Sequence, residues 1–207
     1  MEDCQEANVT RYEFRVFAPD LSRIAACMRQ LGVVTGRRQS METYLLSWTA
    51  GDFGVKIRDH RIEIKKRLDT AGFLERWKPM CRQPFPLSSS FLYQELLPAL
   101  GISLVETGGT RIGEDFLLEA LLKPHPEVRQ VQVDKRRVFV QFNQCRAEYV
   151  GLSVEGTFLQ SAAVEAEKRE PVLEAIARLG LDPACNTSYP KQLSDVSGLK
   201  GETRLHR

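Results

Sequence analysis

Apolar and polar residues alternate along the first third of the chain, and this alternation predicts antiparallel β-strands. The segment Thr10–Phe17 (TRYEFRVF) is apolar at every second position until its end. Ser40–Trp48 is rich in β-forming residues, and Gly54–Arg58 and Arg61–Leu68 alternate again. Only an Asp-His dipeptide separates the last two segments, so they predict a hairpin.

Other segments carry the pattern or the end signals of helices. A helix is expected over Ser22–Leu31, with Asp20 or Ser22 as its cap and Gly32 at its end. The Pro-rich stretch Phe73–Gly101 reads as an irregular connection that contains a short helix over Phe91–Leu100.

The second half of the chain repeats this plan of strands followed by a helix. Phe116–Leu122 fits a strand or a short helix, and apolar residues at helical spacing predict a helix over Gln160–Leu179, which Pro171 interrupts and Gly180 ends. The expected strands are Ser103–Arg111, then Val128–Asp134 and Arg137–Asn143 as a hairpin around Lys135-Arg136, then Ala147–Glu155.

Composition narrows the class of protein. With 207 residues, 43% hydrophobic and 27% charged, the chain is expected to be one α+β domain over residues 10–193, with a flexible segment 1–9 and a disordered tail 194–207. The net charge of +2 argues against a partner of duplex nucleic acid. No apolar run approaches a membrane span, residues 1–8 do not read as a signal peptide, and five scattered cysteines suggest reduced thiols. A cytoplasmic location is therefore expected, and an open sheet edge would allow a homodimer.

Charged residues recur at alternate positions on several of the expected strands. They are Arg11, Glu13 and Arg15; Lys56 and Arg58; Glu63, Lys65 and Arg67; Arg136 or Arg137; and Glu155. One explanation is a sheet with one solvent-exposed face. The other is a closed or cupped sheet whose charged inner face concentrates positive potential on a multiply charged anion. Arginine binds phosphate oxygens bidentately, and the interleaved carboxylates would bind a divalent cation.

The order of these segments resembles the CYTH, or triphosphate-tunnel, superfamily. That family opens on an ExExK strand, has basic residues on several strands, and continues through an acidic E-x-E strand, a helix and a Lys-Ser-Tyr segment. The corresponding segments here are RYEFR (Arg11–Arg15), ETYLLS (Glu42–Ser47), KIR (Lys56–Arg58), EIK (Glu63–Lys65), DKRR (Asp134–Arg137), SVE (Ser153–Glu155), ARLGL (Ala177–Leu181) and TSYPKQL (Thr187–Leu193).

The resemblance implies an eight-stranded antiparallel tunnel-like β-barrel with flanking helices. It implies a phosphohydrolase that uses Mg²⁺ or Mn²⁺ and acts on inorganic triphosphate, a nucleotide or another triphosphorylated compound, or a cyclase that acts on ATP. It makes Glu13 and Glu155 metal ligands, and it assigns phosphate binding to Arg11, Arg15, Lys56, Arg58, Lys65, Arg67, Arg136 and Arg137.

The chain also departs from the family pattern where the family has carboxylates. Arg11 stands in place of the first acid of ExExK, Ser153 in place of the first acid of E-x-E, and Gln141 and Asn143 lie where an aspartate is expected. These replacements favour an alternative function, a non-catalytic domain that binds a polyphosphate, a nucleotide or an anionic partner. A pure interaction domain, in which the strand charges only face water, is the third hypothesis.

Overall fold

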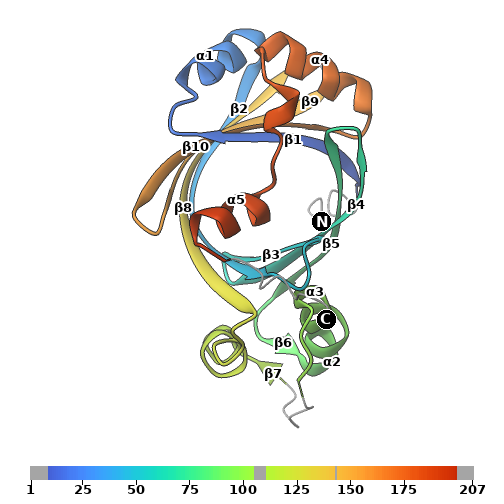
Figure 1. Cartoon of the computed structure of the whole chain (residues 1–207), viewed down its shortest axis with the longest axis vertical. Coiled ribbons are helices and arrows are strands. Elements are labelled where there is room, and N and C mark those ends of the chain that lie inside the picture. Colours follow the sequence, from blue (N-terminus) through green and yellow to red (C-terminus); the bar gives the residue numbers. More distant parts are fainter. Residues whose placement is uncertain (1–8, 105–110, 143, 200–207) are drawn as a thin grey trace, which may run out of the picture.

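Eight antiparallel strands close into a barrel in the computed structural model, which describes residues 9–104, 111–142 and 144–199 (Figure 1). The strands follow one another around the barrel in the order β1-β10-β9-β8-β2-β3-β4-β5. Their bounds are β1 (Arg11–Ala18), β2 (Val33–Ser47), β3 (Phe53–Arg58), β4 (Arg61–Ala71), β5 (Leu74–Pro84), β8 (Val128–Phe142), β9 (Cys145–Val154) and β10 (Thr157–Ala166). The expected eight-stranded tunnel-like barrel is therefore confirmed.

The β3–β4 hairpin forms where the sequence predicts it. Arg58 pairs with Arg61, and the two turn residues Asp59 and His60 have positive φ angles of 51° and 53°. Positive φ at both central residues is the mark of a type I′ turn, whose twist matches that of the flanking strands. The hairpin sets the register that points Lys56 and Glu63 to the same side of the sheet.

Two sequence predictions about the strands are wrong. Val128–Asp134 and Arg137–Asn143 are not a hairpin, since β8 runs unbroken through Lys135 and pairs with both β2 and β9. The apolar residues of β8 change face midway along the strand, from Val133 on the inside of the barrel to Val140 on the outside. This change breaks the alternation of the sequence and makes one long strand look like two short ones. The prediction of irregular structure after Phe73 misses β5, in which Pro79 is accommodated beside a register shift.

The helix predicted over Gln160–Leu179 is in fact a strand followed by a helix. Residues up to Ala166 belong to β10, and α4 occupies only Arg169–Leu179. Ala162, Ala163 and Val164 are all buried because one face of β10 packs under α4 while the other faces the barrel interior. A strand buried on both faces loses its alternation, so its pattern cannot be told from that of a helix.

Helices cover two parts of the outer surface of the barrel. Helix α1 (Ser22–Leu31) and α4 pack over one end of the strands. Helix α1 ends at Gly32 as predicted, and a Cβ at this glycine would lie 2.6 Å from the carbonyl oxygen of Gln141. Gly32 is therefore required by close packing of the helix end on β8.

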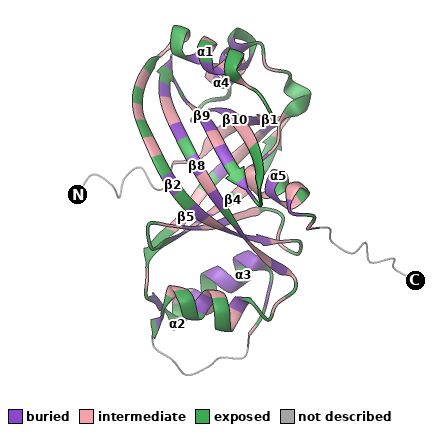
Figure 2. Cartoon of the chain, turned by 90° about the vertical axis from the view of Figure 1, so that its left-hand side faces the viewer, coloured by how far each residue is buried: buried purple, intermediate pink, exposed green. Residues whose placement is uncertain are grey.

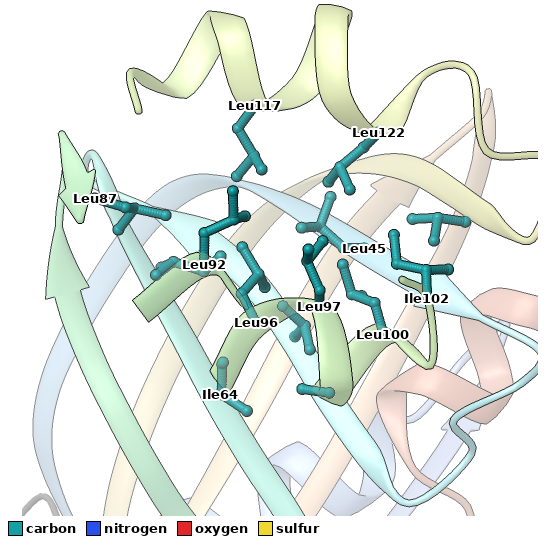
Figure 3. Packing of buried hydrophobic residues seen from close by; sticks show 14 of the residues in the cluster. Leu45, Ile64, Leu87, Leu92, Leu96, Leu97, Leu100, Ile102, Leu117 and Leu122 are labelled. Atoms are coloured by element: carbon teal, nitrogen blue, oxygen red, sulfur yellow. The ribbon is translucent and has the colours of Figure 1, made fainter. Parts of the chain in front are cut away.

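A second group of helices packs against the outside of β2, β3 and β4, opposite α1 and α4 (Figure 2). It consists of α2 (Ser89–Phe91), the π-helical η2 (Leu92–Leu96), α3 (Leu97–Leu100) and the π-helical η3 (Phe116–Leu122), with the two-stranded ladder β6 (Leu87–Ser88) and β7 (Arg111–Ile112) beside them. Their leucines, among them Leu92, Leu96 and Leu117, meet Leu45 and Ile64 of the barrel in one apolar cluster (Figure 3). The helix predicted over Phe91–Leu100 is thus present, Phe116–Leu122 is helical, and most of the strand predicted over Ser103–Arg111 lies outside the described residues.

Helix α5 (Tyr189–Val196) lies inside the ring of strands when the barrel is viewed along its axis (Figure 1). Leu193 is fully buried there, in a cluster with inward-facing Leu46, Val133 and Leu152. The prediction of disorder from residue 194 is wrong for its first residues, because α5 continues to Val196, and residues 200–207 lie outside the described residues. The interior of the barrel is apolar around α5 and polar elsewhere.

Candidate functional site: a charged cavity in the barrel

The polar part of the barrel interior encloses a cavity of about 340 Å³. Seven basic side chains line it, and they are Arg15, Lys56, Arg58, Lys65, Lys135, Arg137 and Arg146. Four acidic side chains join them, and they are Glu13, Glu63, Glu148 and Glu165. Among the described residues, basic side chains therefore outnumber acidic ones in the lining. Low-dielectric walls concentrate the resulting positive potential in the cavity, where it would attract an anion.

Glu42 of β2 organises the basic residues of β3 and β8. Its carboxylate is fully buried, and it lies 3.3 Å from Lys56 Nζ, 3.4 Å from Arg58 Nη1 and 3.1 Å from Lys135 Nζ. Arg137 also donates to it, as do the hydroxyls of Ser40 and Tyr44. Burial alone raises the pKa of Glu42, but the charges of Lys56, Lys135 and Arg137 hold that pKa far below its ordinary value.

Arg15 of β1 organises the acidic residues on the other side. Its Nε lies 2.9 Å from Glu13 Oε1, its Nη1 lies 2.8 Å from Glu148 Oε1, and it donates to Ser161 Oγ at 3.1 Å. Burial opposes its charge, but the carboxylates of Glu13 and Glu148 raise the pKa of Arg15 well above its ordinary value. Burial also raises the pKa of Glu148, and Arg15, Arg137 and Lys135 overcome this and lower it to about 2.

Lys135 occupies the centre of the cavity wall, between two tyrosines. It is fully buried, its Nζ donates to Tyr44 Oη at 2.6 Å, and the same nitrogen lies 3.3 Å from the ring centroid of Tyr189. Tyr189 also stacks on Tyr44 and faces the guanidinium of Arg15 at 4.5 Å. Burial, more than any neighbour, lowers the pKa of Lys135 well below its ordinary value.

Two buried polar atoms of the cavity lining have no hydrogen-bond partner within the part of the chain that the structure describes. They are Arg58 Nε and Tyr189 Oη, and the third such atom, Arg76 Nε, belongs to a residue outside the lining. Buried donors without acceptors are rare in folded proteins and call for a specific explanation. Both atoms are enclosed by surrounding protein atoms and are not exposed to the cavity.

The structure brings most of the predicted phosphate-binding residues together. Arg15, Lys56, Arg58, Lys65 and Arg137 line the cavity, as does the predicted metal ligand Glu13. These charges face a closed interior, so the hypothesis of a sheet face exposed to bulk water does not describe them.

Four predicted site residues lie elsewhere. Arg11 starts β1 opposite Trp77, outside the lining, and Arg67 pairs with Asp52 at 2.7 Å and Glu75 at 3.0 Å. Arg136 is exposed, because its neighbours Lys135 and Arg137 take the inward positions of β8. Glu155 lies in the β9–β10 turn with a positive φ of 47° and pairs with Arg129 at 2.9 Å.

Sequence reasoning missed four of the eleven charged residues that line the cavity among the described residues. Lys135 was placed in a turn, and Glu165 was hidden in a predicted helix. Arg146 and Glu148 alternate on β9, and this spacing was a usable signal. The strand directly before α4 is β10 and not β9, and its Glu165 lines the cavity.

The expected metal ligands do not form a metal site. Glu155 lies outside the cavity, and the Oε1 atom of Glu13 accepts a hydrogen bond from Arg15. No group of three or more His, Cys, Asp or Glu side chains in residues 9–104, 111–142 and 144–199 is arranged to hold a metal ion. The pair Glu13 and Glu155 therefore does not fit Mg²⁺ or Mn²⁺, whose oxygen ligands must converge on one point.

Comparison with known proteins identifies the fold. No family model matches the sequence, and no curated protein matches it. A conserved hypothetical protein of Pyrococcus furiosus is 13% identical with a TM-score of 0.53, over 87% of this chain and 98% of that one. The PH1012 protein of Pyrococcus horikoshii is 13% identical with a TM-score of 0.51, over 86% and 98%.

A third match, HpAC1 from Hippeastrum, is described as a candidate adenylyl cyclase with a dominant triphosphatase activity. It is 10% identical to this chain with a TM-score of 0.50, and the match covers 95% of this chain and 100% of that one. At such identities the likeness is one of fold. The chain shares its fold with these structures, and this fold is the closed barrel of eight antiparallel strands that the resemblance of its segments predicts.

Proposed function

We propose that the barrel binds a triphosphate or another polyphosphate anion in its cavity. The observation that carries this proposal is the surplus of cations around the cavity, where seven basic side chains face four acidic ones. Phosphate oxygens are strong acceptors, and guanidinium and ammonium groups are the side chains that recognise them. The bound anion would lie among Arg15, Lys56, Arg58, Lys65 and Arg137.

The first test is calorimetric titration of the protein with inorganic triphosphate, with orthophosphate and sulfate as reference anions. Lys65→Gln removes a cation that lines the cavity, whereas Lys66→Gln removes its exposed neighbour on the same strand. One charged hydrogen bond contributes about 1.5–3 kcal/mol, so Lys65→Gln should weaken binding by about tenfold or more while Lys66→Gln leaves it unchanged.

Two outcomes would contradict the proposal. One is wild-type protein that does not bind triphosphate. The other is an equal loss of affinity in both lysine variants, which would mean that the anion is held by the general surface charge and not inside the barrel.

Hydrolysis of the bound triphosphate is a second candidate function, and the triphosphatase activity attributed to HpAC1 favours it. Phosphate release from inorganic triphosphate and from ATP, each with Mg²⁺, Mn²⁺ or a chelator, tests it on the wild type beside Glu13→Ala. Release that depends on a metal and disappears in the variant would support a metal-dependent hydrolase whose activity requires Glu13. If the wild type releases no phosphate, hydrolysis is ruled out and only the binding function remains. Formation of cyclic AMP is measured in a separate assay.

A further inference from the structure

The carboxylate of Glu42 lies behind the cavity wall, although all of its cationic partners are in that wall. Lys56, Arg58, Lys135 and Arg137 line the cavity, whereas Glu42 itself does not, and its side chain is fully buried. The four cations therefore stand between one buried negative charge and the space that a ligand would occupy. A fully buried carboxylate persists as an anion only with such partners.

The four contacts of Glu42 are unequal. Lys135 on β8 approaches it at 3.1 Å and Arg137 more closely still, whereas Lys56 and Arg58 on β3 remain at 3.3 and 3.4 Å. The β3 pair is also drawn toward Glu63, whose Oε1 lies 2.6 Å from Arg58 Nη2. Lys56 and Arg58 donate hydrogen bonds to Glu42 and also pair with Glu63, so the β3 cations are shared between two carboxylates.

We propose that Glu42 is a built-in anion that competes with the phosphates of the ligand for Lys56 and Arg58, and so sets the affinity of the cavity for anions. This inference rests on the proposed polyphosphate binding. A carboxylate oxygen and a phosphate oxygen accept from the same donors, so a donor directed at Glu42 is less available to the ligand. The negative charge of Glu42 also lowers the positive potential of the wall, and charges inside a protein are screened less than charges on its surface.

Substitution of Glu42 separates this role from a purely structural one. Glu42→Gln keeps the size of the side chain and removes its charge. The variant without ligand should melt at a lower temperature than the wild type, because four cations lose their shared partner. Its affinity for inorganic triphosphate should nevertheless rise by about tenfold, since one opposing charge at short range is gone. If Glu42 only supported the fold, Glu42→Gln would lower the stability of the protein and leave its affinity for triphosphate unchanged or weaker.

A matched control is Glu75→Gln. Glu75 is a half-buried glutamate that accepts from Arg67 and Trp77, but it does not contact Lys56, Arg58, Lys135 or Arg137 and does not line the cavity. This variant should lose stability without any gain in triphosphate affinity. Glu42→Asp keeps the charge on a shorter side chain, so it should raise the affinity for triphosphate less than Glu42→Gln does. It keeps the proposal testable if Glu42→Gln fails to fold.

The measurement is calorimetric titration with inorganic triphosphate alone, in the presence of a chelator, together with melting curves of each variant. A wild type that binds while Glu42→Gln and Glu42→Asp bind equally or more weakly would overturn the role of Glu42 and leave the proposed function intact. Binding by neither the wild type nor any variant would overturn both. Binding that appears only in Glu42→Gln would support the competition and show that Glu42 suppresses it fully.

Discussion

At the scale of single residues, carboxylates that each contact more than one cation hold the polar part of the barrel interior together. Glu148 illustrates this, because it accepts from Arg15 at 2.8 Å and lies 3.7 Å from Arg137. Its pKa of about 2 is below the ordinary value, so the folded state favours the ionised form. Glu148 therefore stabilises the fold fully above its unfolded pKa, and this contribution is lost as the pH falls from about 4.5 toward 2.

Replacing Glu148 should change the acid sensitivity of the protein. Glu148→Gln is expected to lower the free energy of unfolding at pH 7 by on the order of 3 kcal/mol, and to make the loss of stability between pH 4.5 and pH 2 shallower than in the wild type. Urea denaturation at a series of pH values measures both effects. Glu119→Gln, which breaks an exposed pair with Lys123, should change neither. Parallel pH curves for the wild type and Glu148→Gln would show that Glu148 is not ionised preferentially in the folded state.

At the scale of secondary-structure elements, the decisive feature is α5, which fills one part of the barrel and forms a wall of the cavity with its first residue. Tyr189 reaches the cations of the cavity, while Leu193, one turn later, is buried among inward-facing residues of the strands. The helix therefore couples packing of the barrel interior to the shape of the proposed binding site.

Shortening the side chain at the apolar anchor of α5 should destabilise the protein. Leu193→Ala is expected to cost about 2–5 kcal/mol, because it removes buried methyl groups and leaves a cavity among Leu46, Val133 and Leu152. The exposed Lys191 on the same helix provides the comparison, and Lys191→Ala should be within about 0.5 kcal/mol of the wild type. Urea denaturation followed by tryptophan fluorescence measures both variants. Equal stabilities of the two variants would mean that α5 contributes little to the packing of the interior.

At the scale of the whole molecule, a net charge of only +2 conceals a strong separation of charge. The cavity collects a surplus of cations, and the remaining surface balances them. Closure of the barrel also pairs both edges of the eight-stranded sheet, so the exposed edge on which the expected homodimer depended is not present in that sheet. None of the described helices is long and apolar enough to cross a bilayer. The cytoplasmic location and the homodimer remain predictions.

The sequence by itself determined the elements whose signals are local. The alternation around Glu13 and Arg15, the turn residues Asp59 and His60, and the stop of α1 at Gly32 depend on neighbouring residues alone. From these, and from a resemblance in their order, the barrel and five of its inward cations could be predicted. Strand periodicity suffices for this because a strand in a closed barrel has one inner face.

Only the tertiary structure decided which face of β8 and β10 points inward and which carboxylates join the site. Lys135 and Glu165 were missed because each lies on a strand with apolar residues on both faces, one packed under α1 and α4 and the other directed to the interior. Glu155 was wrongly placed because the strand ends one residue before it. Burial on both faces removes the period-two signal, and only the register between neighbouring strands then determines where a charge points.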